Sequence, residues 1–136
     1  MKINELKNLL NEFGEKVRFE HDLKKKNWFN IGGKSKVFFK ADNLKELINF
    51  IKKLKGREKI FILGAGSNTL MTDNLFDGVV IKLSRNFNNI SLLGKDVIIA
   101  GSAVLDKALS DFAISNHLVD LNFYPVYPEQ LEVVLE

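Results

Sequence analysis

The feature that most constrains the fold of this chain is a strand–helix–strand pattern between residues 36 and 63. Residues 36–41 are typical of a strand, and residues 44–54 place leucine and isoleucine at helical spacing. Asn43 is a suitable N-cap for that helix, and Gly56 is a suitable stop. Residues 60–63 are all apolar, which indicates a strand buried on both faces. We therefore expect a β-α-β unit with parallel strands and a right-handed crossover.

Shorter elements flank this unit and follow from the same periodicities. In chain order they are a helix over 3–13, strands over 17–20, 79–83 and 97–100, an irregular stretch over 85–93, and a helix from 104 to about 116. The sum is an α+β chain in which a β-α-β-β lobe precedes the start of a second lobe. The predicted core consists of Val37, Phe39, Leu47, Ile48, Ile51, Ile60, Ile62, Val80, Ile81, Ile98 and Phe112.

Composition narrows the functional classes. The chain has 136 residues, enough for one ordinary domain, and no cysteine, which excludes disulfides, zinc–thiolate sites and a cysteine nucleophile. Because there is no run of about 20 apolar residues and no apolar leader, we expect an unprocessed, cytoplasmic chain without membrane contact. The net charge is only +3, and the chain has only three arginines, so nucleic-acid binding is not expected. The lysine run 24–26 is expected to be a solvated loop rather than an anion-facing patch.

Chemistry is expected where the strand over 60–63 ends, in the loop Gly64-Ala65-Gly66-Ser67-Asn68-Thr69. Two glycines at a strand end permit positive φ and a close approach of a ligand to the backbone. Successive N–H groups in such a turn form a nest for anions, and the short polar side chains add donors. The loop lacks the Gly-Lys-Ser/Thr of a P-loop and the third glycine of the Rossmann fingerprint. It predicts a phosphate site that needs no lysine or arginine, with a plain glycine turn as the alternative.

Four motifs in a fixed order give this loop a context. They are Asn27-Trp28-Phe29-Asn30-Ile31-Gly32-Gly33, Leu63-Gly64-Ala65-Gly66-Ser67-Asn68, Gly78-Val79-Val80-Ile81 and Ala100-Gly101-Ser102-Ala103-Val104. Over about residues 1–123 the chain resembles the flavin-binding part of the UDP-N-acetylenolpyruvoylglucosamine reductase family, also called UDP-N-acetylmuramate dehydrogenases. The resemblance implies the FAD-binding PCMH-type fold, in which FAD lies between two lobes. It also implies an oxidoreductase that uses FAD and NADPH in peptidoglycan synthesis, and hence in cell-wall biogenesis, cell shape and cell division.

The same resemblance assigns cofactor contacts. It implies that the FAD pyrophosphate is held by Gly64, Ala65, Gly66, Ser67, Asn68 and Thr69. It places Gly101 near the flavin ring, and it assigns no catalytic residue or metal ligand to this chain. Trp28 is expected to be a packing anchor rather than a ligand contact, because an indole buries a large area. Asp73 is expected to stabilise its loop through an Asx-turn, and His21 and His117 receive no catalytic role.

The resemblance stops at residue 126. The family continues with Gly-Ile-Pro-Gly-Thr-Ile-Gly-Gly, whereas residues 126–133 read Val-Tyr-Pro-Glu-Gln-Leu-Glu-Val. One set of codons for the family motif encodes that replacement when its first base is deleted, so we predict a frame shift near codon 126. The expected division is a partial FAD-binding domain over 1–125 and an out-of-frame tail over 126–136 without selected structure. The partial domain comprises a first lobe over about 15–85 and the start of a second over about 94–123.

Three functional hypotheses follow. The first is a truncated FAD-binding fragment of this reductase. It would be inactive alone and unable to bind the UDP-sugar, because the resemblance places the catalytic groups and the substrate-binding domain beyond the break. The second is a flavin- or nucleotide-binding module completed by a separately encoded C-terminal half. The third is a basic anion- or nucleic-acid-binding protein, whose affinity would fall steeply with salt. In the first two cases the last strand and helix are expected to expose apolar surface.

Overall fold

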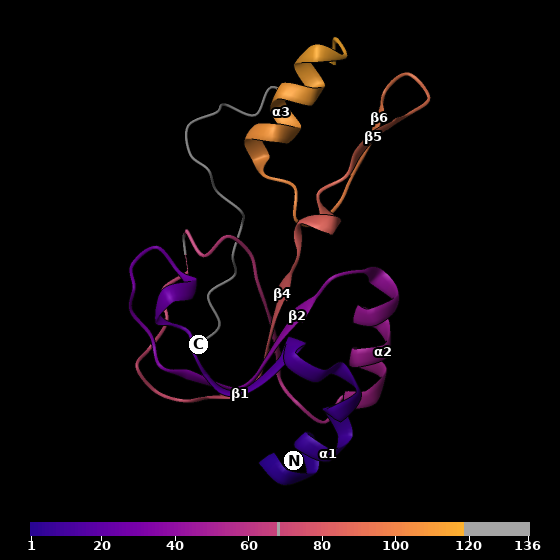
Figure 1. Cartoon of the computed structure of the whole chain (residues 1–136). Coiled ribbons are helices and arrows are strands. Elements are labelled where there is room, and N and C mark those ends of the chain that lie inside the picture. The colour runs from indigo at the N-terminus through magenta and orange to yellow at the C-terminus, as the bar shows by residue number, and fades with distance from the viewer. Residues whose placement is uncertain (68, 119–136) are drawn as a thin grey trace.

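The computed structural model describes residues 1–67 and 69–118, and Figure 1 shows how its elements are arranged. In chain order the elements are α1 (Ile3–Leu10), η1 (Asn11–Lys16), β1 (Val17–Asp22), η2 (Lys24–Lys26), β2 (Lys34–Ala41), α2 (Leu44–Leu54), β3 (Ile60–Leu63), β4 (Phe76–Leu83), η3 (Arg85–Phe87), β5 (Ile90–Leu93), β6 (Val97–Ala100) and α3 (Asp106–Ser115), where η marks a 3-10 helix. The predicted out-of-frame tail lies outside the described residues.

A four-stranded mixed sheet forms the first part of the chain, in the order β1-β2-β4-β3. β1 pairs antiparallel with β2, whereas β4 pairs parallel with both β2 and β3. The predicted strand–helix–strand unit is therefore present as β2-α2-β3 with parallel strands. β4 lies between its two strands, however, so the strands joined by α2 are not neighbours.

The alternation of side chains along the strands divides this sheet into two faces. Val37, Phe39 and Ile81 point to the face against which α1 and α2 lie (Figure 1). Phe38 and Val80 point to the opposite face, where they pack in a smaller cluster with Leu23 and Leu63. We call this second side the loop face, because loop residues before β2 and after β3 gather on it.

The buried side of α2 differs from the predicted one. Phe50 and Leu54 are fully buried, and the Phe50 ring stacks on Phe39 with 3.9 Å between centroids. The predicted core residues Ile48 and Ile51 are instead 43% and 40% exposed, so their assignment to the core is wrong. An aromatic pair buries more area than an isoleucine and adds a stacking contribution, which fixes the rotation of the helix.

The other core predictions are mostly right on the sheet and weaker away from it. Val37, Phe39, Val80 and Ile81 are buried, and Leu47, Ile60, Ile98 and Phe112 are half-buried. Ile62 is exposed, contrary to the prediction, because β3 is an edge strand of the sheet. The predicted set lacks three buried side chains of the N-terminal region, namely Leu6, Leu10 and Phe13.

The stretch over 85–93, predicted to be irregular, contains η3 and β5. β5 pairs antiparallel with β6 in a separate two-stranded sheet. This hairpin and α3 project beyond the end of β4, away from the four-stranded sheet (Figure 1). Further boundaries differ by two or three residues: β1 extends to Asp22, β4 begins at Phe76, and α3 begins at Asp106.

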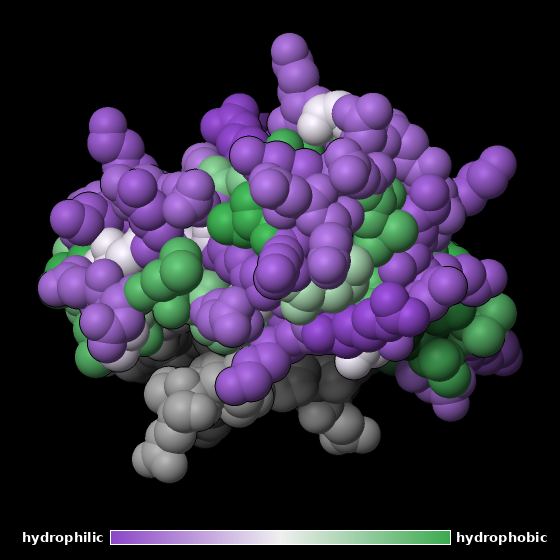
Figure 2. All heavy atoms as spheres, turned by 90° about the horizontal axis from the view of Figure 1, so that it is seen from below, coloured by the Kyte–Doolittle hydropathy of each residue, from purple (hydrophilic) through white to green (hydrophobic). Residues whose placement is uncertain are grey.

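The surface seen from below in Figure 1, on the side of the N-terminus, is covered largely by hydrophilic side chains (Figure 2). Hydrophobic side chains show there only in small patches. Within the two described ranges, no helix has the length and apolar character needed to cross a bilayer.

Candidate functional site

The glycine loop after β3 is clamped at two of its carbonyl groups. The carbonyl oxygen of Gly64 accepts a hydrogen bond from Lys82 Nζ on β4 at 2.8 Å. The carbonyl oxygen of Gly66 accepts one from the backbone N–H of Trp28 at 2.9 Å. Because a trans peptide points its C=O and N–H groups in opposite directions, the N–H groups of Ala65 and Ser67 are turned away from these two donors. Contacts inside the protein therefore set the orientation of the loop.

Close backbone packing explains why position 66 is glycine. Gly66 has a φ of +76°, which disfavours other residues. A Cβ atom there would lie 2.3 Å from the carbonyl oxygen of Lys26 and 2.9 Å from Cα of Asn27. The glycine is thus required by contact with the segment that precedes Trp28, whatever ligand the loop holds.

The Gly32-Gly33 pair makes a second contact of the same kind with the chain that follows the glycine loop. The N–H of Gly33 donates to the carbonyl oxygen of Thr72 at 2.8 Å. A Cβ at Gly33 would lie 2.2 Å from the Asn74 carbonyl oxygen, and one at Gly32 would lie 2.8 Å from Cβ of Met71. The tryptophan motif, by which we mean residues 27–33, therefore packs closely against Gly66 and against residues 71–74.

The Asn27 side chain stabilises the conformation of the tryptophan motif. Its side chain is buried, and Nδ2 donates to the carbonyl oxygen of Ile31 at 2.7 Å and, more weakly, to that of Leu23 at 3.4 Å. Its Oδ1 is buried without a hydrogen-bond partner among the described residues. Nothing in the sequence pattern indicated this role, because asparagine before an aromatic pair is also typical of exposed turns.

A hollow of about 770 Å³ lies on the loop face of the sheet, with Ala65 of the glycine loop in its wall. Neighbouring strands bring charged side chains into it, because Arg18 pairs with Phe38 and Lys40 pairs with Lys82. The lining includes six basic side chains, Lys16, Arg18, Lys25, Lys26, Lys40 and Lys82, and two acidic ones, Glu15 and Asp42. We call it the basic hollow. The sequence predicted a phosphate loop without lysine or arginine, so this positive charge beside the loop was not foreseen.

Part of this charge is already neutralised. Lys16 Nζ lies 2.5 Å from Glu46 Oε1 and 2.9 Å from Asp42 Oδ2. These hydrogen bonds, to Glu46 first, raise the pKa of Lys16, and the Lys16 ammonium in turn lowers the pKa of both carboxyl groups. Arg18 and Lys40, by contrast, form no ion pair with any described residue. The basic hollow therefore keeps a net positive charge suited to an anion.

His21 lies close to the basic side chains of the hollow but is itself uncharged. Its ring centroid is 4.6 Å from that of Phe38, and its Nε2 is buried without a hydrogen-bond partner among the described residues. Burial lowers the pKa of His21, and the nearby charges of Lys26 and Arg18 lower it further. The imidazole is therefore neutral at pH 7, and it belongs to the floor of the loop face rather than to the charged lining.

The structure spreads the predicted cofactor contacts over different environments. Gly64 and Ala65 are half-buried, whereas Gly66, Ser67 and Thr69 are buried, and Asn68 lies outside the described residues. Thr69 Oγ1 is buried without a hydrogen-bond partner within the described part of the chain. Gly101 is elsewhere: a Cβ on it would lie 2.0 Å from the Phe87 carbonyl oxygen, so it packs against η3 and does not line the basic hollow.

Two expectations about the tryptophan motif change with the structure. Trp28 is 65% exposed and lines the basic hollow, so its interpretation as a packing anchor is wrong. The lysine run is only partly a solvated loop, because Lys25 and Lys26 also line the hollow. Lys26 Nζ lies 5.4 Å from the centroid of the Phe38 ring, a cation–π distance.

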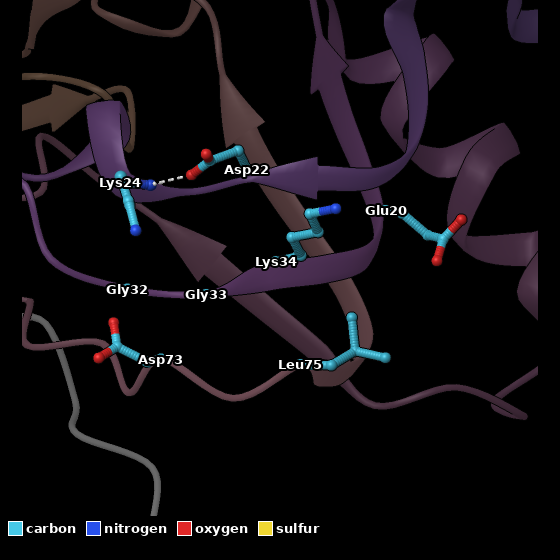
Figure 3. A pocket seen from close by; sticks show the side chains of 8 residues that line it. All are labelled: Glu20, Asp22, Lys24, Gly32, Gly33, Lys34, Asp73 and Leu75. Carbon is cyan, nitrogen blue, oxygen red and sulfur yellow. Dashed lines mark hydrogen bonds between the residues drawn. The ribbon is translucent and has the colours of Figure 1, made fainter.

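A second, smaller hollow of about 420 Å³ has Gly32 and Gly33 in its wall (Figure 3). Its lining has three acidic side chains, Glu20, Asp22 and Asp73, and two basic ones, Lys24 and Lys34. Asp22 Oδ1 accepts the Lys24 N–H at 2.8 Å, while the exposed Asp73 carboxylate bonds to no described residue, so the predicted Asx-turn is not formed with them. Over residues 1–67 and 69–118, no group of histidine, aspartate and glutamate is suited to hold a metal ion.

Comparison with known proteins gives consistent relatives. No protein-family model matches the chain. It is 59% identical over 128 residues to the UDP-N-acetylenolpyruvoylglucosamine reductase of Pelagibacter ubique, a match that covers 94% of this chain and 42% of the relative. The reductase of Orientia tsutsugamushi (strain Ikeda) is 39% identical over 99 residues, which are 71% of this chain and 33% of that protein.

The fold has a solved counterpart as well. The crystal structure of UDP-N-acetylenolpyruvylglucosamine reductase from Thermus caldophilus superposes with a TM-score of 0.52 at 23% identity, over 73% of this chain and 32% of that one. The predicted α+β fold class is thereby confirmed. The chain spans less than half the length of the proteins it matches.

Proposed function

Because this chain is a partial-length relative of the UDP-N-acetylenolpyruvoylglucosamine reductases, we propose that it is a dinucleotide-binding part of such an enzyme. Its ligand is FAD, whose diphosphate lies at the glycine loop over residues 64–69. The observation that carries the proposal is the position of Ala65 in the wall of the basic hollow. A clamped glycine turn and a lining of net positive charge meet at this place.

The residues present fit a diphosphate. Anions bind well to backbone N–H groups in glycine turns, and Gly66 keeps the turn packed against the tryptophan motif. Arg18 and Lys40 supply positive charge and form no ion pair with any described carboxylate. The Thr69 hydroxyl is buried without a hydrogen-bond partner among the described residues and is not part of the lining of the basic hollow. These residues would bind and orient the cofactor.

FAD, when bound, supplies a ring that accepts and returns hydride, which is the redox chemistry of an oxidoreductase in peptidoglycan synthesis. The residues of this chain contribute binding and orientation to that reaction. We assign the reduction of the enolpyruvyl sugar, with NADPH as donor, to the cytoplasmic enzyme as a whole. The 42% of the relative's length that this chain spans is proposed to be inactive by itself.

A titration tests the proposal. Full-length chain is titrated with FAD at two salt concentrations, as are the Lys40→Met and Arg18→Met variants. Each variant is expected to weaken binding about three- to tenfold and to flatten the salt dependence, since each removes one cation that faces the phosphates. Lys34→Met, which removes an exposed lysine that lines the second hollow, is the matched control. Absence of binding to FAD, ADP and pyrophosphate alike would overturn the proposal.

One observation favours a second candidate, a module completed by a separate polypeptide. Leu93, Val97 and Ile99 are 58%, 49% and 53% exposed, and alternation places them on one face of the β5–β6 hairpin. An apolar face of this kind suits contact with further protein. Co-expression with the remaining part of the Pelagibacter-type reductase would then give yellow, copurifying protein. Colourless protein with and without that part would exclude the second candidate.

A further inference from the structure

We propose that Trp28 is a stacking platform for a planar ring of the nucleotide whose phosphates the basic hollow holds. The inference rests on the proposed function and adds a ring-binding subsite to it. The ring is either the adenine or the isoalloxazine of a dinucleotide, since both present the same flat aromatic face to an indole.

Trp28 is exposed although its backbone is fixed. Its side chain is 65% exposed, even though burial of so large an apolar ring is favourable. Exposure is not caused by a loose backbone, because the Trp28 N–H is bonded to the Gly66 carbonyl oxygen at 2.9 Å. A fixed backbone that presents an aromatic side chain to solvent is the arrangement found where bases stack on proteins.

The indole also lies where a nucleotide ring can reach it. Trp28 lines the basic hollow together with Ala65 of the glycine loop and with Lys25 and Lys26. Its neighbour Phe29 is 54% exposed but does not line that hollow. A nucleotide joins its phosphates to a flat ring through a short sugar linker. A ligand with its phosphates on the charged lining therefore carries a ring that can reach the indole.

The indole matches such a ring chemically. The lining cations suit the phosphates, whereas the indole offers a flat aromatic face to a neutral heterocycle. Stacking on indole is tolerant of ring identity, because every base has a π-face, and alanine substitution of such a platform commonly weakens binding about tenfold or more. Trp28 is the one group in the lining of the hollow with a ring of that size.

Trp28 also reports on the test, because it is the only tryptophan in the chain. Its fluorescence is followed while full-length chain is titrated with FAD, ADP, FMN and inorganic pyrophosphate. Affinities for the same four probes are then measured by calorimetry for Trp28→Ala, Trp28→Phe and the matched control Phe29→Ala. We expect quenching by ring-bearing probes and about tenfold weaker binding of them to Trp28→Ala. Pyrophosphate binding should be unchanged, Trp28→Phe should retain most of the affinity, and Phe29→Ala should resemble the wild type.

The probes separate the two rings and the two proposals. A loss with ADP but not FMN identifies adenine, and the reverse identifies isoalloxazine. Equal binding of FAD by Trp28→Ala and wild type overturns the stacking role while the FAD-binding proposal stands. An equal loss of pyrophosphate and FAD binding in Trp28→Ala also overturns it, because the indole would then only hold the loop. Failure of every probe to bind the wild-type chain removes the proposed function and this inference with it.

Discussion

The backbone N–H of Trp28 donates a hydrogen bond to the carbonyl oxygen of Gly66, with 2.9 Å between the two atoms. This bond joins two motifs that are far apart in the sequence. Since a Cβ at position 66 would meet the Lys26 carbonyl oxygen at 2.3 Å, the two segments touch without an intervening side chain. The glycine loop thus takes its shape from the tryptophan motif before it meets any ligand.

Replacement of Gly66 by alanine should therefore destabilise the protein itself. The new Cβ adds steric overlap with Lys26 to the cost of a positive φ, so we expect a loss of about 2–5 kcal/mol in the free energy of unfolding. Gly56→Ala is the matched control. Gly56 has a φ of +68°, but a Cβ there would meet no atom within 4 Å, so its cost should stay at about 1–2 kcal/mol. Equal losses in urea unfolding of both variants would contradict the close contact.

The strands and helix of the first sheet could be predicted from the sequence, because strand and helix periodicities there are strong. It could not supply the strand order, since the insertion of β4 between β2 and β3 depends on long-range pairing. The rotation of α2 was mispredicted because Ile48 and Ile51 fit a helical stripe as well as Phe50 does. Only the stack of Phe50 on Phe39 decides between them.

The candidate site divides in the same way. The glycine loop is a local pattern and was predicted from the sequence. The basic hollow is not local, because Arg18, Lys40 and Lys82 come from three strands and meet only through their register. Each alternates with apolar residues in its own strand, which is a weak signal for a charged face. The exposure of Trp28 could not be predicted either, since size alone favours burial.

Lys36 should be the most sensitive charged residue of the sheet. Its Nζ lies 3.1 Å from Glu58 Oε2 and 2.9 Å from Asp77 Oδ1, and the Glu58 side chain is only 3% exposed. Lys36→Met leaves that buried carboxylate with one cation fewer, so we expect a loss of about 2–4 kcal/mol in the free energy of unfolding. Lys34→Met removes an exposed lysine of the same strand and should cost less than about 0.5 kcal/mol. A Lys36→Met variant as stable as Lys34→Met would show that the ion pairs contribute nothing.

His21 should give the protein a specific sensitivity to mild acid. Its folded-state pKa is lowered by burial and by the Lys26 and Arg18 charges, so the unfolded chain takes up a proton at higher pH than the folded one. Stability should then fall as pH decreases from about 6.5 toward the lowered pKa of the folded state. His21→Asn should remove this part of the pH dependence in thermal unfolding. A pH dependence that is the same in His21→Asn and in the wild type would contradict this assignment.

Genomic DNA tests the frame shift near codon 126. Adding one base there should convert the codons of residues 126–133 into Gly-Ile-Pro-Gly-Thr-Ile-Gly-Gly. The physical reason to expect this motif is that close backbone approach to a flavin requires glycine, which the present residues cannot replace. Resequencing both strands distinguishes a real shift from a reading error. If no frame of the locus encodes the glycine pairs, the frame-shift hypothesis is wrong.

The apolar face of the β5–β6 hairpin should promote self-association of the chain without contributing to its stability. Leu93 pairs with Val97, and with Ile99 they form a face whose side chains are about half exposed. Val97→Thr and Ile99→Thr keep β-branched residues in the strand while removing apolar surface, so the midpoint of thermal unfolding should be unchanged. The concentration at which the protein stays monomeric in sedimentation experiments should rise, because an exposed apolar strand promotes self-association. Val79→Thr, at a fully buried position of β4, is the contrasting substitution and should lower the unfolding midpoint. A comparable drop for the hairpin variants would mean that this face is packed within the molecule and is no site of self-association.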